Sequence, residues 1–385
     1  MDKFNRFYGV GKDYFESRAC VHTAGEIAHQ PAMWRKLSEY LRETKPTIAD
    51  FMGKLDKNMR IVLTGAGSSG FIGKAVAGFA AQSVGKNIEA IHTTDIVSAP
   101  EMCLFADTPT LLISFARSGN SPESVGAVKY ARKIVKNLFE IAIVCDGDSR
   151  LGNITRESDR GLVLVMPEGT NDKGFAMTSS VSCMMLAGFA ALCFSDIDKI
   201  VDDILLLADQ VEKDSADMAK AAAACAELDF ERAWYLGSGP LAALAQEGAL
   251  KMMELTNGAV VAGFNNSAEF RHGPKTVLNP KTLTVHFISN NEFTAKYDLD
   301  MLNELYSQRD GNKVAAICAR DNPVQADLVM PYEARGQDIA VGIQGLVFMQ
   351  LLSMYTSLKL NVPTDNPSPT GLVNRVVQGV TVYEY

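Results

Sequence analysis

The sequence predicts an α/β protein with two tandem domains, each a parallel five-stranded sheet flanked by helices, behind an N-terminal helical segment. Short apolar runs alternate with helical patterns at the spacing of βαβ units. The chain also resembles itself at an offset of 172 positions, from Arg60 to Arg232. At this offset Arg60–Ser68 matches Arg232–Pro240 and Thr110–Phe115 matches Thr282–Phe287, and further along the chain, outside this offset, Leu164–Glu168 resembles Leu328–Tyr332. A domain-sized repeat indicates a duplication rather than a solenoid.

The elements follow in order from this pattern. Thr23–Thr44 is expected to be helical, and the first sheet is expected to use the strands Ile61–Thr64, Ile88–Thr93, Thr110–Phe115, Glu140–Cys145 and Leu162–Val165. Helices are expected at Phe71–Gly85 and Pro122–Lys136, and a long helical connection at Asp202–Leu228. The expected domains are residues 1–45, 46–205 and 206–385. Parallel sheets bind ligands outside the carboxyl ends of their strands, so the loops there are the candidate site.

Composition excludes several classes of protein. The 385 residues carry 37 Lys+Arg and 45 Asp+Glu, a net charge of −8, with no dense basic run, which argues against nucleic-acid binding. Seven dispersed cysteines form no CxxC pair, so neither a disulfide framework nor a zinc site is expected. The N-terminus lacks the apolar segment of a signal peptide, and the apolar stretch near Met177–Phe194 contains serines typical of a core helix. The sequence therefore predicts a cytoplasmic protein without a membrane partner.

The first candidate loop is Gly65-Ala-Gly-Ser-Ser-Gly70, between a predicted strand and a predicted helix. It matches GxGxxG, the fingerprint of dinucleotide binding. The acidic partner that this fingerprint requires is poorly placed, because Glu89 falls inside the next strand and Asp95 falls late. A purely structural turn and an anion site are the other interpretations.

The second candidate loop, Phe115–Glu123, follows the predicted strand Thr110–Phe115 of the same sheet. Ser121 is placed to cap a helix whose first residue is Pro122. Free N–H groups at such a helix start favour an anion, and Ser118, Ser121 and Arg117 add donors. An ordinary capped helix is the alternative for one such loop. Two hydroxyl-rich loops at successive strand ends favour a phosphate site.

The third candidate group lies in the second copy. Lys251 and Glu254 are three positions apart and share a helix face, and His272 precedes a Gly-Pro turn. A Lys/Glu pair or a single histidine is by itself typical of a protein surface. Here all three residues follow one Gly-rich strand end within a short span, which makes them candidates for catalysis. The second copy's own loop, Ser289–Phe293, lacks the Ser-Gly-x-Ser pattern and carries Glu292, which would repel phosphate. We therefore expect one functional site per pair of domains.

From about Lys45 to the C-terminus, these motifs resemble the tandem-domain branch of the SIS (sugar isomerase) family. The family's phosphate loop, S-x-S-G-x-T, becomes Ala116–Ser121 here, and Ser69 matches the serine of the first loop. The resemblance implies that Glu254 moves the substrate proton, that His272 opens the sugar ring and that Lys251 assists. Where a synthase of the family carries an essential lysine in its tail, this chain has Gln378. Further expected substrate contacts are Ser68, Thr178, Ser179, Glu269 and Gln378.

The activity that the resemblance implies is deaminating isomerisation of an amino-hexose 6-phosphate, with galactosamine 6-phosphate giving tagatose 6-phosphate and ammonia. It implies a small-molecule sugar-phosphate substrate, no cofactor, no metal and a homo-oligomer, either a dimer or a tetramer. Two alternatives remain. One is aldose–ketose isomerisation without loss of nitrogen, and the other is a non-catalytic sugar-phosphate sensor. Release of ammonia separates the favoured reaction from both.

Overall fold

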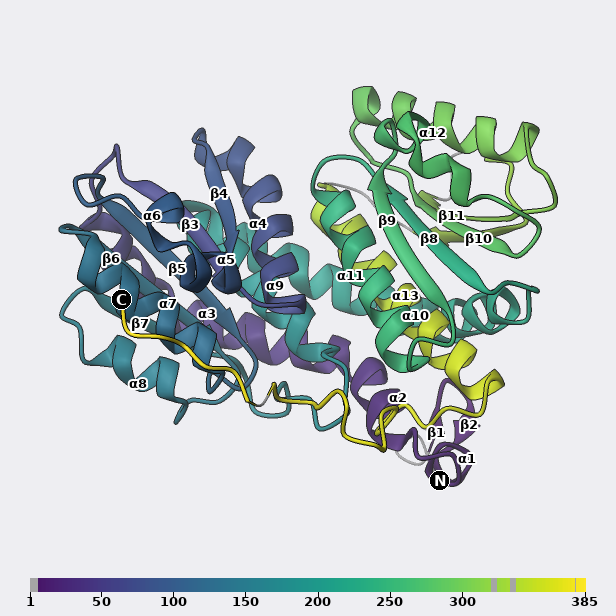
Figure 1. The fold of residues 1–385 in the computed structure, drawn as a ribbon, viewed down its shortest axis with the longest axis horizontal. Coiled ribbons are helices and arrows are strands. Elements are labelled where there is room, and N and C mark those ends of the chain that lie inside the picture. The colour runs from purple at the N-terminus through teal and green to yellow at the C-terminus, as the bar shows by residue number, and fades with distance from the viewer. Residues whose placement is uncertain (1–5, 320–323, 333–336, 378) are drawn as a thin grey trace. The chain divides into compact units, whose positions relative to one another are not determined.

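The computed structural model describes residues 6–319, 324–332, 337–377 and 379–385. This part of the chain forms two compact units, each built around a parallel five-stranded sheet (Figure 1). The first-sheet unit contains residues 32–172, 179–208 and the tail from Val373, and the second-sheet unit contains the described residues up to Pro31, 173–178 and 209–372. Both units are discontinuous in sequence, and the domain boundaries given above stay predictions.

The first sheet has the strand order β4-β3-β5-β6-β7. Its strands are β3 (Arg60–Gly65), β4 (Ile88–His92), β5 (Thr110–Ala116), β6 (Leu138–Val144) and β7 (Gly161–Val165), all parallel. The central strand β5 is buried along its whole length, as a continuous apolar run in a sheet covered on both faces requires. The predicted strands of the first copy are thereby confirmed.

The helices of the first-sheet unit are α3 (Gln30–Gly53), α4 (Ser68–Val84), α5 (Thr93–Ser98), α6 (Pro100–Cys103), α7 (Pro122–Ile134), α8 (Arg150–Arg156) and α9 (Ser179–Leu192). After η2 (Phe194–Asp196), the long helix α10 (Ile197–Ala226) forms the predicted connection between the copies. Helix α4 begins at Ser68 rather than at the predicted Phe71, so the serines of the first candidate loop lie in its first turn.

The predicted N-terminal helix is two helices, α2 (Val21–Ala28) and α3. The break falls next to Pro31, because proline is favoured in the first turn of a helix, where its missing N–H costs nothing. Before α2 lie the short elements β1 (Arg6–Phe7), β2 (Val10–Gly11) and α1 (Lys12–Glu16). In the second-sheet unit, the Glu26 carboxylate accepts hydrogen bonds from the Lys173 and Gly174 amides, which fixes the segment before Thr178.

The second sheet has the order β9-β8-β10-β11-β12, the same connectivity as the first. Its strands are β8 (Arg232–Gly237), β9 (Val261–Asn266), β10 (Thr282–Phe287), β11 (Lys313–Ala319) and β12 (Leu328–Tyr332). Its helices are α11 (Pro240–Leu255), η3 (Glu269–His272), η4 (Pro274–Val277), α12 (Glu292–Ser307) and α13 (Asp338–Lys359). Gly67 and Gly239 share one backbone conformation, φ 55° and ψ −130°, which confirms the internal duplication.

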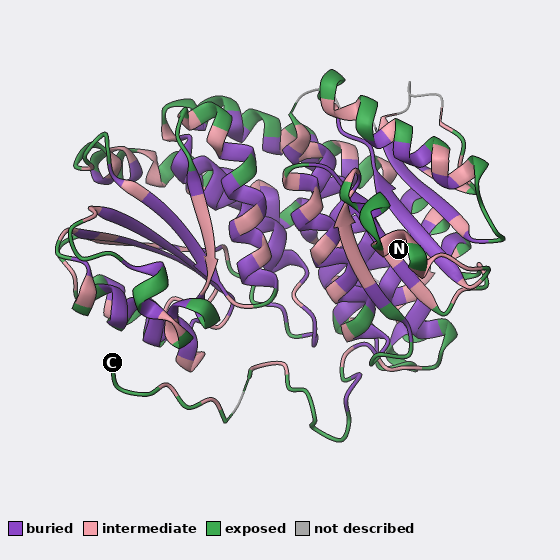
Figure 2. Cartoon of the chain, turned by 45° about the horizontal axis from the view of Figure 1, so that its top comes forward, coloured by how far each residue is buried: buried purple, intermediate pink, exposed green. Residues whose placement is uncertain are grey.

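Burial follows the layers of each unit, with the strands and the inner helix faces mostly buried (Figure 2). One described helix, α13, is long and apolar enough to cross a membrane, but 83% of its most apolar window is buried inside the protein. A core helix passes the same test of length and composition. The apolar stretch near Met177–Phe194 forms α9, whose residues are all buried, as expected of a core helix.

Candidate functional site

The two hydroxyl-rich loops lie at neighbouring strand ends of the first sheet, because β3 and β5 are hydrogen-bonded to each other. After β3, Gly67 turns the chain with a positive φ, and Ser68 and Ser69 begin α4. Both serines are buried, with 4% and 5% of their surface exposed. After β5, residues Arg117 to Ser121 connect to α7. The predicted adjacency of the two loops is therefore confirmed.

The second loop is shaped for an anion at the start of a 13-residue helix. The Ser121 hydroxyl caps α7 by accepting a hydrogen bond from the Ser124 amide at 3.3 Å. Gly119 has a φ of 60°, and a Cβ there would lie 2.5 Å from Ser149 Oγ, so the turn requires glycine. The Ser118 hydroxyl accepts from the Asn120 amide and is half-buried. Amide donors and the helix dipole make such an end attractive to phosphate.

Arg117 brings a buried positive charge to this loop, with 7% of its surface exposed. Its Nη2 donates a hydrogen bond of 2.7 Å to the carbonyl of Arg375, in the C-terminal tail. The Arg375 guanidinium in turn donates to the Asp172 carbonyl. The side chain of Asp172 caps α9 by accepting from the amides and hydroxyls of Ser179 and Ser180. The buried hydroxyl of Ser179 is thus engaged in a helix cap.

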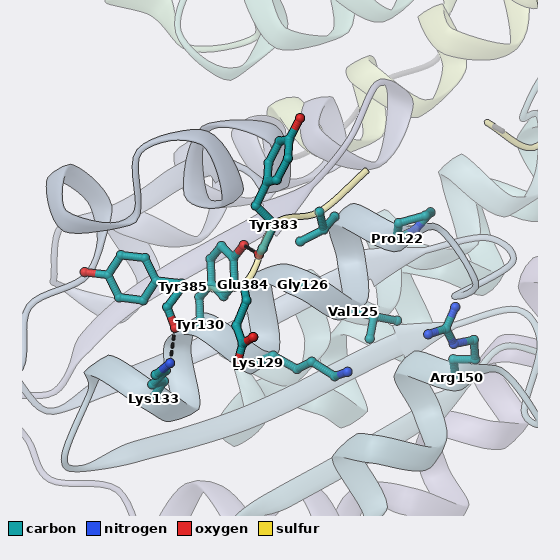
Figure 3. Close-up of a pocket in the computed structure, with 11 residues that line it drawn as sticks. Pro122, Val125, Gly126, Lys129, Tyr130, Lys133, Arg150, Tyr383, Glu384 and Tyr385 are labelled. Atoms are coloured by element: carbon teal, nitrogen blue, oxygen red, sulfur yellow. Dashed lines mark hydrogen bonds between the residues drawn. The ribbon is translucent and has the colours of Figure 1, made fainter. Parts of the chain in front are cut away.

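The tail then runs along α7 (Figure 3). Val382 packs into the apolar core of the first-sheet unit, and the Tyr130 hydroxyl donates to the carbonyl of Tyr383. The tail and α7 border a cavity of about 550 Å³ lined in part by Lys129 and Arg150. The tail is therefore attached at its start, through Arg117, and near its end, through Val382. Gln378 falls between these contacts but lies outside the described residues, so its predicted substrate contact stays a prediction.

Gly126 is expected to be required for this attachment. A Cβ at Gly126 would lie 2.8 Å from a methyl group of Val382, so Gly126→Val should displace the tail at a cost of about 1–3 kcal/mol, the usual range for overpacking. Limited proteolysis by chymotrypsin should then cut faster at Tyr383. The double variant Gly126→Val/Val382→Ala frees most of that space and should restore protection. Equal cleavage of wild type and Gly126→Val would contradict this assignment.

The acid–base candidates of the second copy lie on α11 of the second-sheet unit. Lys251 is fully buried between two carboxylates, with its Nζ 3.3 Å from Glu247 Oε1 and in an ion pair with Glu254. Burial lowers the pKa of Lys251, but the two carboxylates outweigh it, and the pKa lies above its ordinary value. A charged ammonium donates hydrogen bonds and is not a nucleophile. The Glu254 side chain is 25% exposed and is the more accessible of the two carboxylates, since Glu247 is 1% exposed.

Glu269 and His272 lie at the two ends of the 3₁₀ turn η3, and both are exposed. Glu269 accepts from the side-chain amide of Asn265 at 3.1 Å, which ties it to the end of β9. Between them, Phe270 is fully buried and Arg271 pairs with acidic residues of α12. The turn is therefore fixed by its middle residues, and His272 is presented at the surface of this unit.

The strand ends of the second sheet hold one buried and one half-buried carboxylate where the first sheet has its candidate phosphate loop. Asp298 accepts from the hydroxyls of Ser238 and Ser267 and from the amide of Ser289. Burial raises the pKa of Asp298, but the nearby His286 and the hydrogen bonds from these serines outweigh it and leave the pKa below its ordinary value. Asp338 accepts from the Ser289 hydroxyl and the Asn290 amide.

These contacts refine the expectation that the second copy does not bind phosphate. The sequence pointed to Glu292, which lies in the first turn of α12. In the structure, Asp298 and Asp338 instead accept hydrogen bonds from the donors of this loop, on Ser289 and Asn290. Neither residue has a sequence signal, because each reads as an ordinary polar position of a helix.

The remaining candidates are placed as follows. Thr178 is fully buried in the second-sheet unit, and its carbonyl accepts from the Gln350 side chain. The roles predicted for Ser68, Thr178, Ser179, Glu269 and Gln378 stay predictions. Two further residues of the candidate sites are not predicted from the sequence. Glu247 could have been found from its i,i+4 spacing to Lys251. His92, at the end of β4, belongs to no sequence motif that would have indicated it.

The duplicated parallel sheet with a hydroxyl-rich loop at its strand ends defines a protein of the tandem SIS-domain class. In sequence, the family described as SIS domain matches residues 54–193 of this chain. D-galactosamine-6-phosphate deaminase AgaS from Shewanella sp. (strain ANA-3) is 38% identical over 94% of this chain and 92% of its own. The protein of the same name from Escherichia coli is 37% identical over 94% and 96%.

A solved structure is also similar along almost the whole chain. The tagatose-6-phosphate ketose/aldose isomerase from Escherichia coli superposes with a TM-score of 0.88 and 34% identity, covering 94% of this chain and 96% of its own. The chain therefore belongs to the tandem SIS-domain family that contains these AgaS proteins.

Proposed function

We propose that the protein converts D-galactosamine 6-phosphate and water into D-tagatose 6-phosphate and ammonia, a hydrolysis of a C–N bond coupled to aldose–ketose isomerisation. The observation that carries this proposal is the similarity to proteins named galactosamine-6-phosphate deaminase along almost the whole chain. The presence of Glu254, His272 and the hydroxyl-rich loop agrees with it. The galacto configuration rests on the names of these relatives alone.

The phosphate is proposed to bind at the loops of the first sheet. The hydroxyls of Ser69, Ser118 and Ser121 and the guanidinium of Arg117 are donors at neighbouring strand ends, and a phosphate needs several converging donors. Because the phosphate is remote from C1 and C2, holding it orients the reacting carbons without taking part in the chemistry. Ser68 is proposed as a further contact.

The proton transfers are proposed for the residues of the second copy. His272 passes a proton to the ring oxygen as the C1–O5 bond breaks and the C1 hydroxyl releases its proton, which gives the open aldehyde. Glu254 removes the proton from C2 while O1 takes up a proton, which forms an enolamine. Glu254 then returns its proton to C1, and loss of one N–H proton leaves an imine at C2. Water adds to this imine, the C–N bond breaks, and ammonia leaves as the ketose forms. Lys251 is proposed to orient Glu254, in keeping with their ion pair.

The test is an ammonia-release assay with galactosamine 6-phosphate, glucosamine 6-phosphate and the corresponding non-amino hexose phosphates. Ammonia from the galacto substrate in preference to its epimer supports the proposal. Conversion of non-amino sugars without ammonia would favour the simple isomerase. Tight binding of sugar phosphate without turnover would favour the sensor.

Arg117→Ala is expected to raise KM about 10- to 100-fold with a smaller change in kcat. A hydrogen bond to a charged group contributes about 1.5–3 kcal/mol, and 1.4 kcal/mol corresponds to tenfold. Steady-state kinetics of ammonia release measures the effect. Arg117→Lys keeps the positive charge, and its KM should lie between those of the wild type and Arg117→Ala. If KM does not change in Arg117→Ala, the phosphate is bound elsewhere.

A further inference from the structure

His92 stands at the edge of the first candidate loop. It is the last residue of β4 and is the register partner of Gly65, the last residue of β3. The half-buried imidazole forms a hydrogen bond with the Gly65 backbone, where the ring N–H is the donor and the carbonyl the acceptor. The proposed function assigns no role to His92. Its position places it against the turn that carries Ser68 and Ser69.

The same ring fills the space above Gly70, the last glycine of the GxGxxG pattern. A Cβ at Gly70 would lie 2.2 Å from His92 Nδ1 and 2.4 Å from Cε1, closer than any side chain can approach. The ring also meets Phe71 edge-on, with ring centroids 5.7 Å apart. Gly70 is therefore explained by the packing of His92, with no need for a dinucleotide at this turn.

His92 thus touches both ends of one turn. Gly65 begins it and Gly70 ends it, and the serines proposed to bind phosphate lie between them. At the start of the turn there is equally little freedom, because a Cβ at Gly65 would lie 2.5 Å from the backbone of Ser69. A turn held at both ends has fewer conformations to lose when its hydroxyls and amides converge on a ligand.

We propose that His92 is a positioning residue of the phosphate site, which holds the Gly65–Gly70 turn so that Ser68 and Ser69 present their donors to the phosphate. The proposal rests on the proposed function for the identity of the ligand. Burial and the nearby Lys74 lower the pKa of His92, which favours the neutral ring, and the proposed role uses the shape of the ring and its hydrogen bond.

The first test replaces the ring but keeps its size. His92→Phe loses the N–H and is expected to raise KM for the sugar phosphate and the Kd for inorganic phosphate together, roughly fivefold to tenfold, with kcat changed less than about twofold. This is the effect of losing a hydrogen bond of about 1 kcal/mol. His22→Phe, at an exposed histidine of the second-sheet unit, is the matched control and should change neither constant.

The second test uses the contact with Gly70. Gly70→Ala should weaken phosphate binding more than His92→Phe does, because the new methyl group and the ring cannot occupy the same space. His92→Ala/Gly70→Ala removes that conflict and should bind phosphate more tightly than Gly70→Ala alone. Chemical denaturation of the same variants separates positioning from a general loss of folding, because positioning changes phosphate binding in protein that is still folded.

Three results would overturn the proposal. They are an unchanged phosphate Kd in His92→Phe, a fall in kcat at constant KM, and the absence of rescue in the double variant. Phosphate binding is measured by calorimetry, independently of turnover. If the wild type binds phosphate but releases no ammonia, the proposed function fails while the role of His92 is still decided.

Discussion

Replacing Glu254 by glutamine is expected to lower kcat for ammonia release by roughly 10²- to 10⁴-fold, the usual contribution of a positioned acid–base group. Glutamine has the shape of glutamate and still accepts a hydrogen bond from Lys251, so the helix should keep its structure. It cannot take a proton from C2. KM and the Kd for inorganic phosphate should remain close to those of the wild type, because the proposed phosphate donors are all in the first-sheet unit.

The matched control for this variant is Glu39→Gln, an exposed glutamate on α3, which should leave kcat unchanged. Proton exchange at C2 gives a second measurement. The variant should no longer exchange the C2 hydrogen of the substrate with deuterium from the solvent. Near-normal ammonia release would remove Glu254 from the mechanism, while a large rise in KM at constant kcat would make it a binding residue.

Lys251→Met is expected to destabilise the protein by about 3–5 kcal/mol, the usual cost of removing one partner of a buried ion pair. The reason is Glu247, whose carboxylate is 1% exposed and would lose its positive partner. Chemical denaturation followed by circular dichroism measures the change. Activity should fall as well, because Glu254 loses the ammonium that pairs with it.

The double variant Glu247→Gln/Lys251→Met separates stability from activity. Without the buried negative charge it should regain a large part of the lost stability, because contacting residues couple strongly. Its activity should stay low, since the partner of Glu254 is still missing. A Lys251→Met protein as stable as the wild type would show that Glu247 is accommodated without a counter-charge.

Much of the architecture could be predicted from the sequence, because it depends on local patterns. The strands around Thr110 and Thr282 are apolar runs followed by turns, and the Gly-Ser-Gly turn of the second copy repeats the glycines of the first. The sequence predicts a later start for α4, at Phe71, because Ser68 and Ser69 read as loop residues. In the structure, the positive φ of Gly67 allows the helix to begin immediately after it.

The parts of the candidate site that could not be predicted depend on contacts between distant residues. Val382 contacts Gly126 of α7 across more than 250 positions of sequence, and a short segment that alternates apolar and polar residues does not indicate where it packs. Asp298 reads as an exposed helix position, yet it is fully buried. His92 is a single histidine at the end of a strand, and only the register of β3 and β4 brings it to Gly65.

The carboxylates of Asp298 and Asp338 make the hydrogen bonding of the Ser289 loop independent of any dissolved anion. An acceptor tethered within the same chain is present at an effective concentration that a dissolved metabolite rarely reaches. The amides and hydroxyls around Ser289 are therefore satisfied whether the cell contains amino sugars or not. In the second copy, two carboxylates of the chain itself thus take the place that an external anion would have on these donors.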